Sequence, residues 1–164
     1  MRYSYSETIK NFISEDESSI LGKLFDNHSN RTVVDLQKNA WKKQIELLKH
    51  QLSTFKGQVY FEFAIPRMGK KVDNIVIIQD IIFIIEFKVG LDNYDKHAIE
   101  QVIDYTIDLK NFHEGSHDTR LIPILVATNA LDHVNTNSSI LNYETSGKAN
   151  KENLRVASQE FFLQ

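Results

Sequence analysis

The sequence predicts an α/β protein in which a central mixed β-sheet is flanked by helices. Short apolar runs rich in β-branched residues, which are typical of strands, occur at 58–66, 72–79, 81–88 and 121–128. Longer segments with apolar residues at helical spacing occur at 37–55 and 95–113. The second helical segment separates the last two strands, and a strand–helix–strand connection of this kind implies a parallel pair. The hairpin strands at 72–79 and 81–88 are expected to be antiparallel.

Composition and length are those of one domain. The chain has 164 residues, of which 41% are hydrophobic and 25% charged, so we expect a single domain over 1–164 with its core at about 35–130. There is no cysteine, which excludes disulfides and thiolate metal sites. With no apolar signal segment at the start, these features predict a cytoplasmic protein. The net charge of −3 argues against broad non-specific binding of nucleic acid but allows a local basic patch.

The segments outside the predicted sheet are less informative. Residues 5–26 predict two short helices or one interrupted helix. Gly57 is expected to end the helix at 37–55. His113, His117 and Asp118 predict a surface loop, since the further ligands that a zinc site needs are missing. In the tail at 131–164, the sequence indicates no more than a short strand at 140–143 and a helix or strand at 154–163.

Charged residues interrupt the predicted hairpin at one end. Two strands that turn at Gln79-Asp80 place Asp73 opposite Glu86, because Asp73 precedes Asp80 by seven residues and Glu86 follows Gln79 by seven. Facing residues in such a pair lie about 4.5–5.5 Å apart at Cβ. Lys88 shares a strand face with Glu86, because side chains alternate along a strand.

Two carboxylates at this separation repel each other unless a cation lies between them. Hard oxygen ligands of this kind suit Mg²⁺ or Mn²⁺. Lys88 beside them could orient a water molecule or stabilise charge on a phosphoryl oxygen. The alternative interpretation is a structural cluster of Asp73, Glu86 and Lys88 at the end of the sheet.

Asp73, a gap of 12 residues and then Glu86-Phe87-Lys88 together resemble the D…(D/E)-x-K motif of the PD-(D/E)XK nuclease superfamily. Val72 stands where the name of the motif has proline. The resemblance implies a restriction-endonuclease-like fold and Mg²⁺-dependent hydrolysis of DNA or, less often, RNA. It also implies that Asp73, Glu86 and the backbone carbonyl of Phe87 bind the metal, and that Lys88 takes part in catalysis.

Glu62 lies in the middle of the strand at 58–66, where an unpaired carboxylate is unusual. Strand alternation predicts that it shares a face with Tyr60. Members of the superfamily often have a third acidic residue on an earlier helix or strand, which makes Glu62, and less so Glu46, a possible metal ligand. The alternative is a structural partner for Arg67 or Lys71.

The loop that follows this strand is basic. Arg67, Lys70 and Lys71 precede Asp73 closely, where a phosphate backbone would need positive charge. We therefore consider these residues for positioning a substrate, against the alternative of an ordinary solvated turn.

Gln101 and Tyr105 lie four residues apart on one face of the helix at 95–113. This Q-x-x-x-Y pattern resembles a motif that follows E-x-K in exonuclease-type members of the superfamily. The resemblance implies that both side chains help to hold the nucleic-acid strand. Alternatively, Gln101 caps polar backbone and Tyr105 belongs to the core.

Over residues 35 to 130, the chain resembles the N-terminal nuclease-like domain of bacterial proteins that carry a P-loop helicase-type ATPase. No ATPase motif occurs in these 164 residues. The prediction is a Mg²⁺-dependent nuclease acting on DNA more readily than RNA. The alternatives are an inactive nuclease-fold module that binds nucleic acid or regulates a larger ATPase, and a domain whose acidic cluster is only structural.

Overall fold

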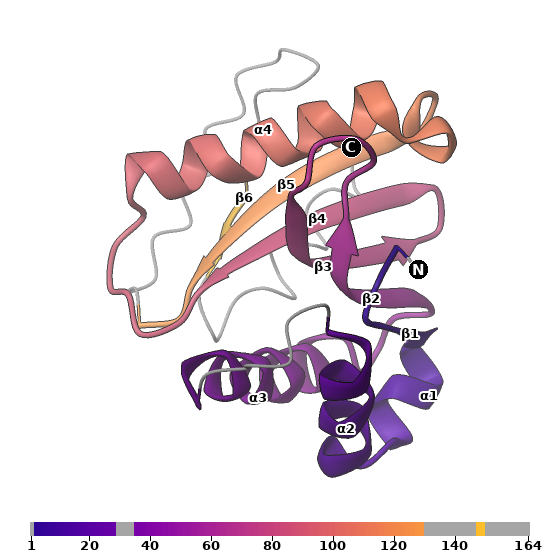
Figure 1. The fold of residues 1–164 in the computed structure, drawn as a ribbon, viewed down its shortest axis with the longest axis vertical. Helices are drawn as coiled ribbons and strands as arrows, with labels where there is room; N and C mark the ends of the chain where they lie inside the picture. The colour runs from indigo at the N-terminus through magenta and orange to yellow at the C-terminus, as the bar shows by residue number, and fades with distance from the viewer. Residues whose placement is uncertain (1, 29–34, 130–146, 150–164) are drawn as a thin grey trace.

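The computed structural model describes residues 2–28, 35–129 and 147–149. They form a mixed sheet of order β1-β2-β3-β4-β5-β6 (Figure 1). Strands β1 to β4 pair antiparallel, whereas β4 pairs parallel with β5 and β5 parallel with β6. The predicted α/β class is therefore confirmed, including the antiparallel hairpin and the parallel pair around the crossover helix. The strands are β1 (Tyr5–Thr8), β2 (Gly57–Ala64), β3 (Lys71–Ile78), β4 (Ile81–Lys88), β5 (Arg120–Ala127) and β6 (Gly147–Ala149).

The two main predicted helices are confirmed, with ends that shift by a few residues. The helices are α1 (Ile9–Ser14), α2 (Glu17–Asn27), α3 (Asp35–Gln51) and α4 (Lys96–Phe112), and a 3₁₀ turn, η1 (Glu114–Ser116), follows α4. None of the described helices is long and apolar enough to cross a membrane. The predicted elements at 140–143 and 154–163 lie outside the described residues.

The N-terminal prediction was partly wrong. Two short helices, α1 and α2, do form, but the first residues of the predicted helical segment are strand β1 instead. Tyr5 pairs with Phe61 of β2, and its buried ring packs edge-on against Phe12 and Phe61. Sheet pairing and aromatic packing therefore override the local helical pattern at this edge.

The prediction that Gly57 ends a helix was wrong. Helix α3 ends at Gln51, and Gly57 is the first residue of β2. A Cβ atom at this position would lie 1.9 Å from the carbonyl oxygen of Ile77 on β3. The glycine is therefore required by the close approach of two strands.

Helices cover both faces of the sheet, with α1, α2 and α3 on one face and α4 on the other (Figure 1). The core under α1–α3 includes Phe12, Leu24, Trp41, Leu48, Phe61 and Phe83. The core under α4 includes Phe63, Val72, Ile84, Val102 and Leu109. Strand β4 alternates between them, with Phe87 in the first core and Ile84 in the second. Glu86 and Lys88 consequently point to the face that α4 covers.

The turn of the β3–β4 hairpin falls where it was predicted. Ile78 pairs with Ile81 and Asn74 with Ile85, and Gln79 adopts a φ of 55° in the turn. Continued by one residue, this register places Asp73 opposite Glu86. The central geometric prediction is confirmed.

Candidate active site

Asp73 and Glu86 meet where β3 begins and β4 ends. Asp73 is half-buried and Glu86 is 5% exposed. The backbone N–H of Phe87 donates to Oδ2 of Asp73 at 2.9 Å, and the backbone N–H of Asp73 lies 3.4 Å from Oε2 of Glu86. Each carboxylate thus contacts the backbone of the other's strand, and this reciprocal arrangement brings the two acidic groups together.

The electrostatics of this pair favour protonation. Burial raises the pKa of Asp73 to about 6, with the charge of Glu62 adding to the effect and the Phe87 N–H and Lys88 opposing it. Burial also raises the pKa of Glu86 to about 8, and the neighbouring Asp73 raises it further. Two adjacent carboxylates with raised pKa values are what a buried like-charge pair produces. A positive charge between them would restore the ionised forms of both.

Lys88 connects this pair to helix α4. Its Nζ lies 3.8 Å from Oε1 of Glu86 and donates to Oε1 of Gln101 at 2.9 Å. The Nε2 of Gln101 donates in turn to the hydroxyl of Tyr105 at 2.7 Å. Burial raises the pKa of that Tyr105 hydroxyl. The E-x-K and Q-x-x-x-Y residues therefore form one continuous chain of polar contacts, an ion pair from Glu86 to Lys88 followed by two hydrogen bonds.

Lys70 extends the chain along α4. Its Nζ lies 3.2 Å from Oδ2 of Asp108 and 5.8 Å from the centroid of the Tyr105 ring. Asp108 was missed by the sequence interpretation. Its spacing of seven residues from Gln101 and three from Tyr105 places all three on one helix face, so helical periodicity could have found it.

Glu62 does not take the predicted orientation. Its φ of 54° breaks the alternation of β2, so that Phe61 and Phe63 lie in different cores. Oε1 accepts hydrogen bonds from Nε1 of Trp41 at 3.0 Å and from Nε2 of Gln37 at 3.2 Å.

Because Trp41 belongs to α3, Glu62 is held toward the layer opposite α4. Among the described residues, the ion pair of Glu62 is with His28, whose Nε2 lies 4.0 Å from Oε2, rather than with the predicted partners Arg67 or Lys71. The charge of Glu62 still raises the pKa of both Asp73 and Glu86, so its part as a metal ligand stays a prediction. Glu46 is exposed and lies 3.1 Å from Lys43.

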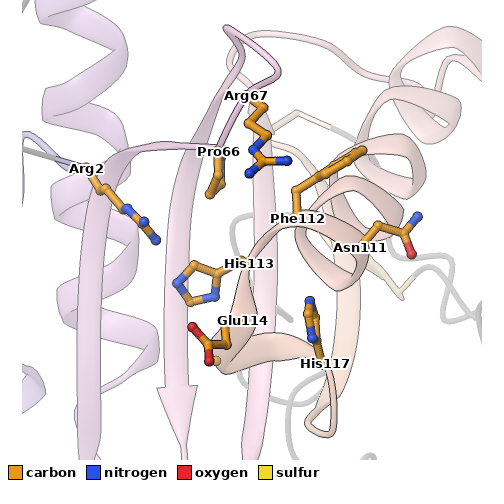
Figure 2. Close-up of a pocket in the computed structure, with 9 residues that line it drawn as sticks. Arg2, Pro66, Arg67, Asn111, Phe112, His113, Glu114 and His117 are labelled. Carbon is orange, nitrogen blue, oxygen red and sulfur yellow. The ribbon is translucent and has the colours of Figure 1, made fainter.

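The other two loop residues differ in position. Lys71 is half-buried and pairs with Ala64 in the sheet. Arg67 is exposed and lines a pocket with Phe112 and His113, at the opposite end of α4 from Gln101 (Figure 2). The separation of Gln101 and Phe112 along the helix axis is roughly 16 Å at 1.5 Å per residue. Arg67 is therefore not part of the carboxylate cluster.

The donor chemistry at this cluster suits a hard divalent cation. Asp73 and Glu86 supply carboxylate oxygens, which Mg²⁺ and Mn²⁺ prefer, and one or two carboxylates with water are a common Mg²⁺ set. In the part of the chain that the structure describes, no group of three or more His, Asp or Glu side chains is arranged to hold a metal. The fit is thus to a site with two carboxylates, in which the Phe87 carbonyl remains a predicted third ligand.

Comparison with protein families, with curated proteins and with solved structures gives no match for this chain. The resemblance to the PD-(D/E)XK superfamily therefore depends on the motif residues and on their geometry. That geometry is a pair of adjacent carboxylates on one hairpin, one half-buried and one buried, a lysine beside them, and a Gln–Tyr pair from the following helix.

Proposed function

We propose that this protein is a Mg²⁺-dependent nuclease with a restriction-endonuclease-like fold, acting on DNA more readily than on RNA. The observation that carries the proposal is the placement of Lys88 between Glu86 and Gln101. Its Nζ lies beside Glu86, which is buried next to Asp73, and it is fixed by Gln101. An apolar sheet end needs no such charged assembly. Placing it there costs free energy, and such costs are typical of functional sites.

Each residue has a role in this proposal. Asp73 and Glu86, with the Phe87 carbonyl, would hold the cation. A bound Mg²⁺ lowers the pKa of a coordinated water and polarises a phosphoryl oxygen. Lys88 orients the attacking water or offsets the developing negative charge. Gln101 fixes the Lys88 ammonium, and Tyr105 lies further along α4 with the Lys70 ammonium against its ring, where a strand would be positioned.

The test is cleavage of plasmid and single-stranded DNA with Mg²⁺, Mn²⁺ or EDTA. We expect cutting with either metal and none with EDTA. Asp73→Asn and Lys88→Ala should each lower the rate by about 10²–10⁴-fold, the usual contribution of a positioned catalytic group. RNA strands of the same sequence give the substrate preference.

Matched controls come from the exposed face of α4. Asp104→Asn and Lys96→Ala remove the same charges from exposed positions and should leave the rate unchanged. Melting curves of all variants check that loss of cutting is not loss of fold. Metal-independent cutting, or equal losses in the control variants, would contradict the proposal.

One observation favours a second candidate, an inactive nuclease-fold module that binds nucleic acid or regulates a larger P-loop ATPase. Oδ2 of Asp73 is occupied by the Phe87 N–H, and Lys88 is held by Gln101. Through these hydrogen bonds, polar groups of the cluster are satisfied by one another, as in a structural cluster. Binding of DNA without metal-dependent cutting in the same assay would favour this function instead.

A further inference from the structure

A second polar site lies at the C-terminal end of α4. It is an open pocket of about 740 Å³ between the β2–β3 loop and the η1 turn (Figure 2). Its cationic side chains come from three separate parts of the chain. The residues that line it and matter here are Arg2, Arg67, Phe112, His113, Glu114 and His117.

The lining is cationic. Two guanidinium groups and two imidazoles face a single carboxylate, that of Glu114. Figure 2 shows the Arg2 and Arg67 side chains extending toward the region of Pro66 and His113 from different sides. Within the described ranges, neither arginine forms an ion pair with a carboxylate. Guanidinium groups without an anionic partner that line one hollow are suited to a planar or tetrahedral anion.

The backbone is constrained at both arginines, by a hydrogen bond at Arg2 and by its conformation at Arg67. The N–H of Ala64 donates to the carbonyl of Arg2 at 2.6 Å, which fixes the start of the chain against the end of β2. Arg67 has a φ of 66°, a conformation that costs a non-glycine residue free energy. Strain of this kind is retained where a side chain must be directed to a particular place. The backbone at both positions is therefore defined, and both guanidinium groups line the same pocket.

His113 is oriented as well. Its Nδ1 lies 2.8 Å from Oγ of Ser116, and its ring packs edge-on against Phe63 with centroids 5.7 Å apart. Among the residues that the structure describes, no hydrogen bond engages the other ring nitrogen, Nε2. Burial lowers the pKa of His113, and the charges of Arg2 and His117 lower it further. The pocket thus has a positive potential, which an anion would relieve.

We propose that this pocket binds a backbone phosphate of a nucleic-acid strand. Arg2 and Arg67 contact the phosphate oxygens, and the ring of Phe112, which is 42% exposed, stacks on a neighbouring base. Lys70 pairs with Asp108, which lies on α4 between Phe112 of the pocket and Gln101, the partner of Lys88. A strand can therefore follow α4 from one site to the other. The pocket's preference for phosphate follows from its lining alone, whereas the identity of the ligand as a strand rests on the proposed function.

Fluorescence anisotropy of a labelled single-stranded oligonucleotide, measured in EDTA to prevent cutting, tests the inference on the full chain. Arg67→Gly removes the guanidinium and relaxes the left-handed backbone, so folding is preserved. Arg2→Ala is the second variant. Each should weaken binding about tenfold and reduce the dependence of log K on log salt by about 0.7, the value for one phosphate contact on a single strand.

Lys42→Ala is the matched control, because it removes one positive charge from an exposed position on α3. Loss of affinity equal to that of this control would overturn the proposal. Competition by inorganic phosphate or a mononucleotide as effective as that by an unlabelled strand would overturn the assignment to a strand. Binding in EDTA is measured independently of metal-dependent cutting, so failure of the nuclease proposal and failure of this one are distinguishable.

Discussion

Glu62 and Glu86 are both buried carboxylates on neighbouring parts of the sheet, yet their surroundings differ. Glu62 is 8% exposed, and its Oε1 accepts hydrogen bonds from the Trp41 indole and the Gln37 amide. Glu86 is 5% exposed and lies beside another carboxylate, Asp73. Glu62 accepts from two neutral donors and has His28 Nε2 at 4.0 Å, whereas Glu86 is destabilised by a like charge that Lys88 at 3.8 Å offsets only in part.

From this difference we infer a structural role for Glu62 and a role in the proposed site for Glu86. A carboxylate with neutral N–H donors fastens α3 to β2, and it needs nothing further. A carboxylate that faces a like charge lowers the free energy of unfolding unless a ligand compensates it. The proposed divalent cation would compensate the repulsion between Asp73 and Glu86, to which Lys88 at 3.8 Å from Glu86 already contributes one positive charge.

Replacing each glutamate by methionine, which has a similar shape, should sharpen the comparison most. Glu62→Met leaves the buried Trp41 N–H without an acceptor, so we expect a loss of about 1–3 kcal/mol in the free energy of unfolding. Glu86→Met removes the repulsion with Asp73 and should leave stability at pH 8 in EDTA unchanged or raised. Urea unfolding measures both, and equal losses in the two variants would contradict the distinction.

The free energy of unfolding is also expected to depend on pH. The pKa of Glu86 is about 8 in the folded chain and that of Asp73 about 6, both above the usual carboxylate values near 4. The native state therefore binds more protons than the unfolded state between about pH 4 and pH 8. In EDTA, the stability contributed by this pair is full below pH 4 and is lost as the pH rises toward 8.

Other groups titrate in this window, so the difference between wild type and Glu86→Gln is the quantity to measure. His113, whose pKa is lowered, acts in the opposite direction, because it gains stability as the pH rises. Its contribution is common to both proteins and cancels. A wild-type protein that tracks Glu86→Gln from pH 5 to pH 8 would show that the carboxylates do not interact.

The part of the site that the sequence predicted follows from simple periodicity. The hairpin turn at Gln79-Asp80 fixes the register, and the register places Asp73 opposite Glu86. The spacing of Gln101 and Tyr105 likewise fixes their common helix face. The alternation of side chains along a strand and the periodicity of a helix are therefore sufficient to predict that these residues lie close together.

The misses occur where backbone geometry departs from the regular pattern. The positive φ of Glu62 turns its side chain away from the face that alternation predicts. The strand at Tyr5–Thr8 forms because β2 offers an edge to pair with, which no local pattern shows. Arg67 joins Arg2 and His113 through contacts between distant segments. Such features depend on tertiary packing, so a local pattern could not predict them.

The central claim is that Asp73 and Glu86 together hold a divalent cation, and melting at pH 8 with increasing Mg²⁺ or Mn²⁺ tests it most directly. Because a ligand of the native state alone stabilises it, Tm should rise by about 5–10 °C at a hundredfold excess over the dissociation constant. The rise should vanish in Asp73→Asn and in Glu86→Gln, and should persist in Glu100→Gln, an exposed control on α4. A wild-type Tm that does not respond to either metal, or an equal rise in Asp73→Asn, would contradict the account.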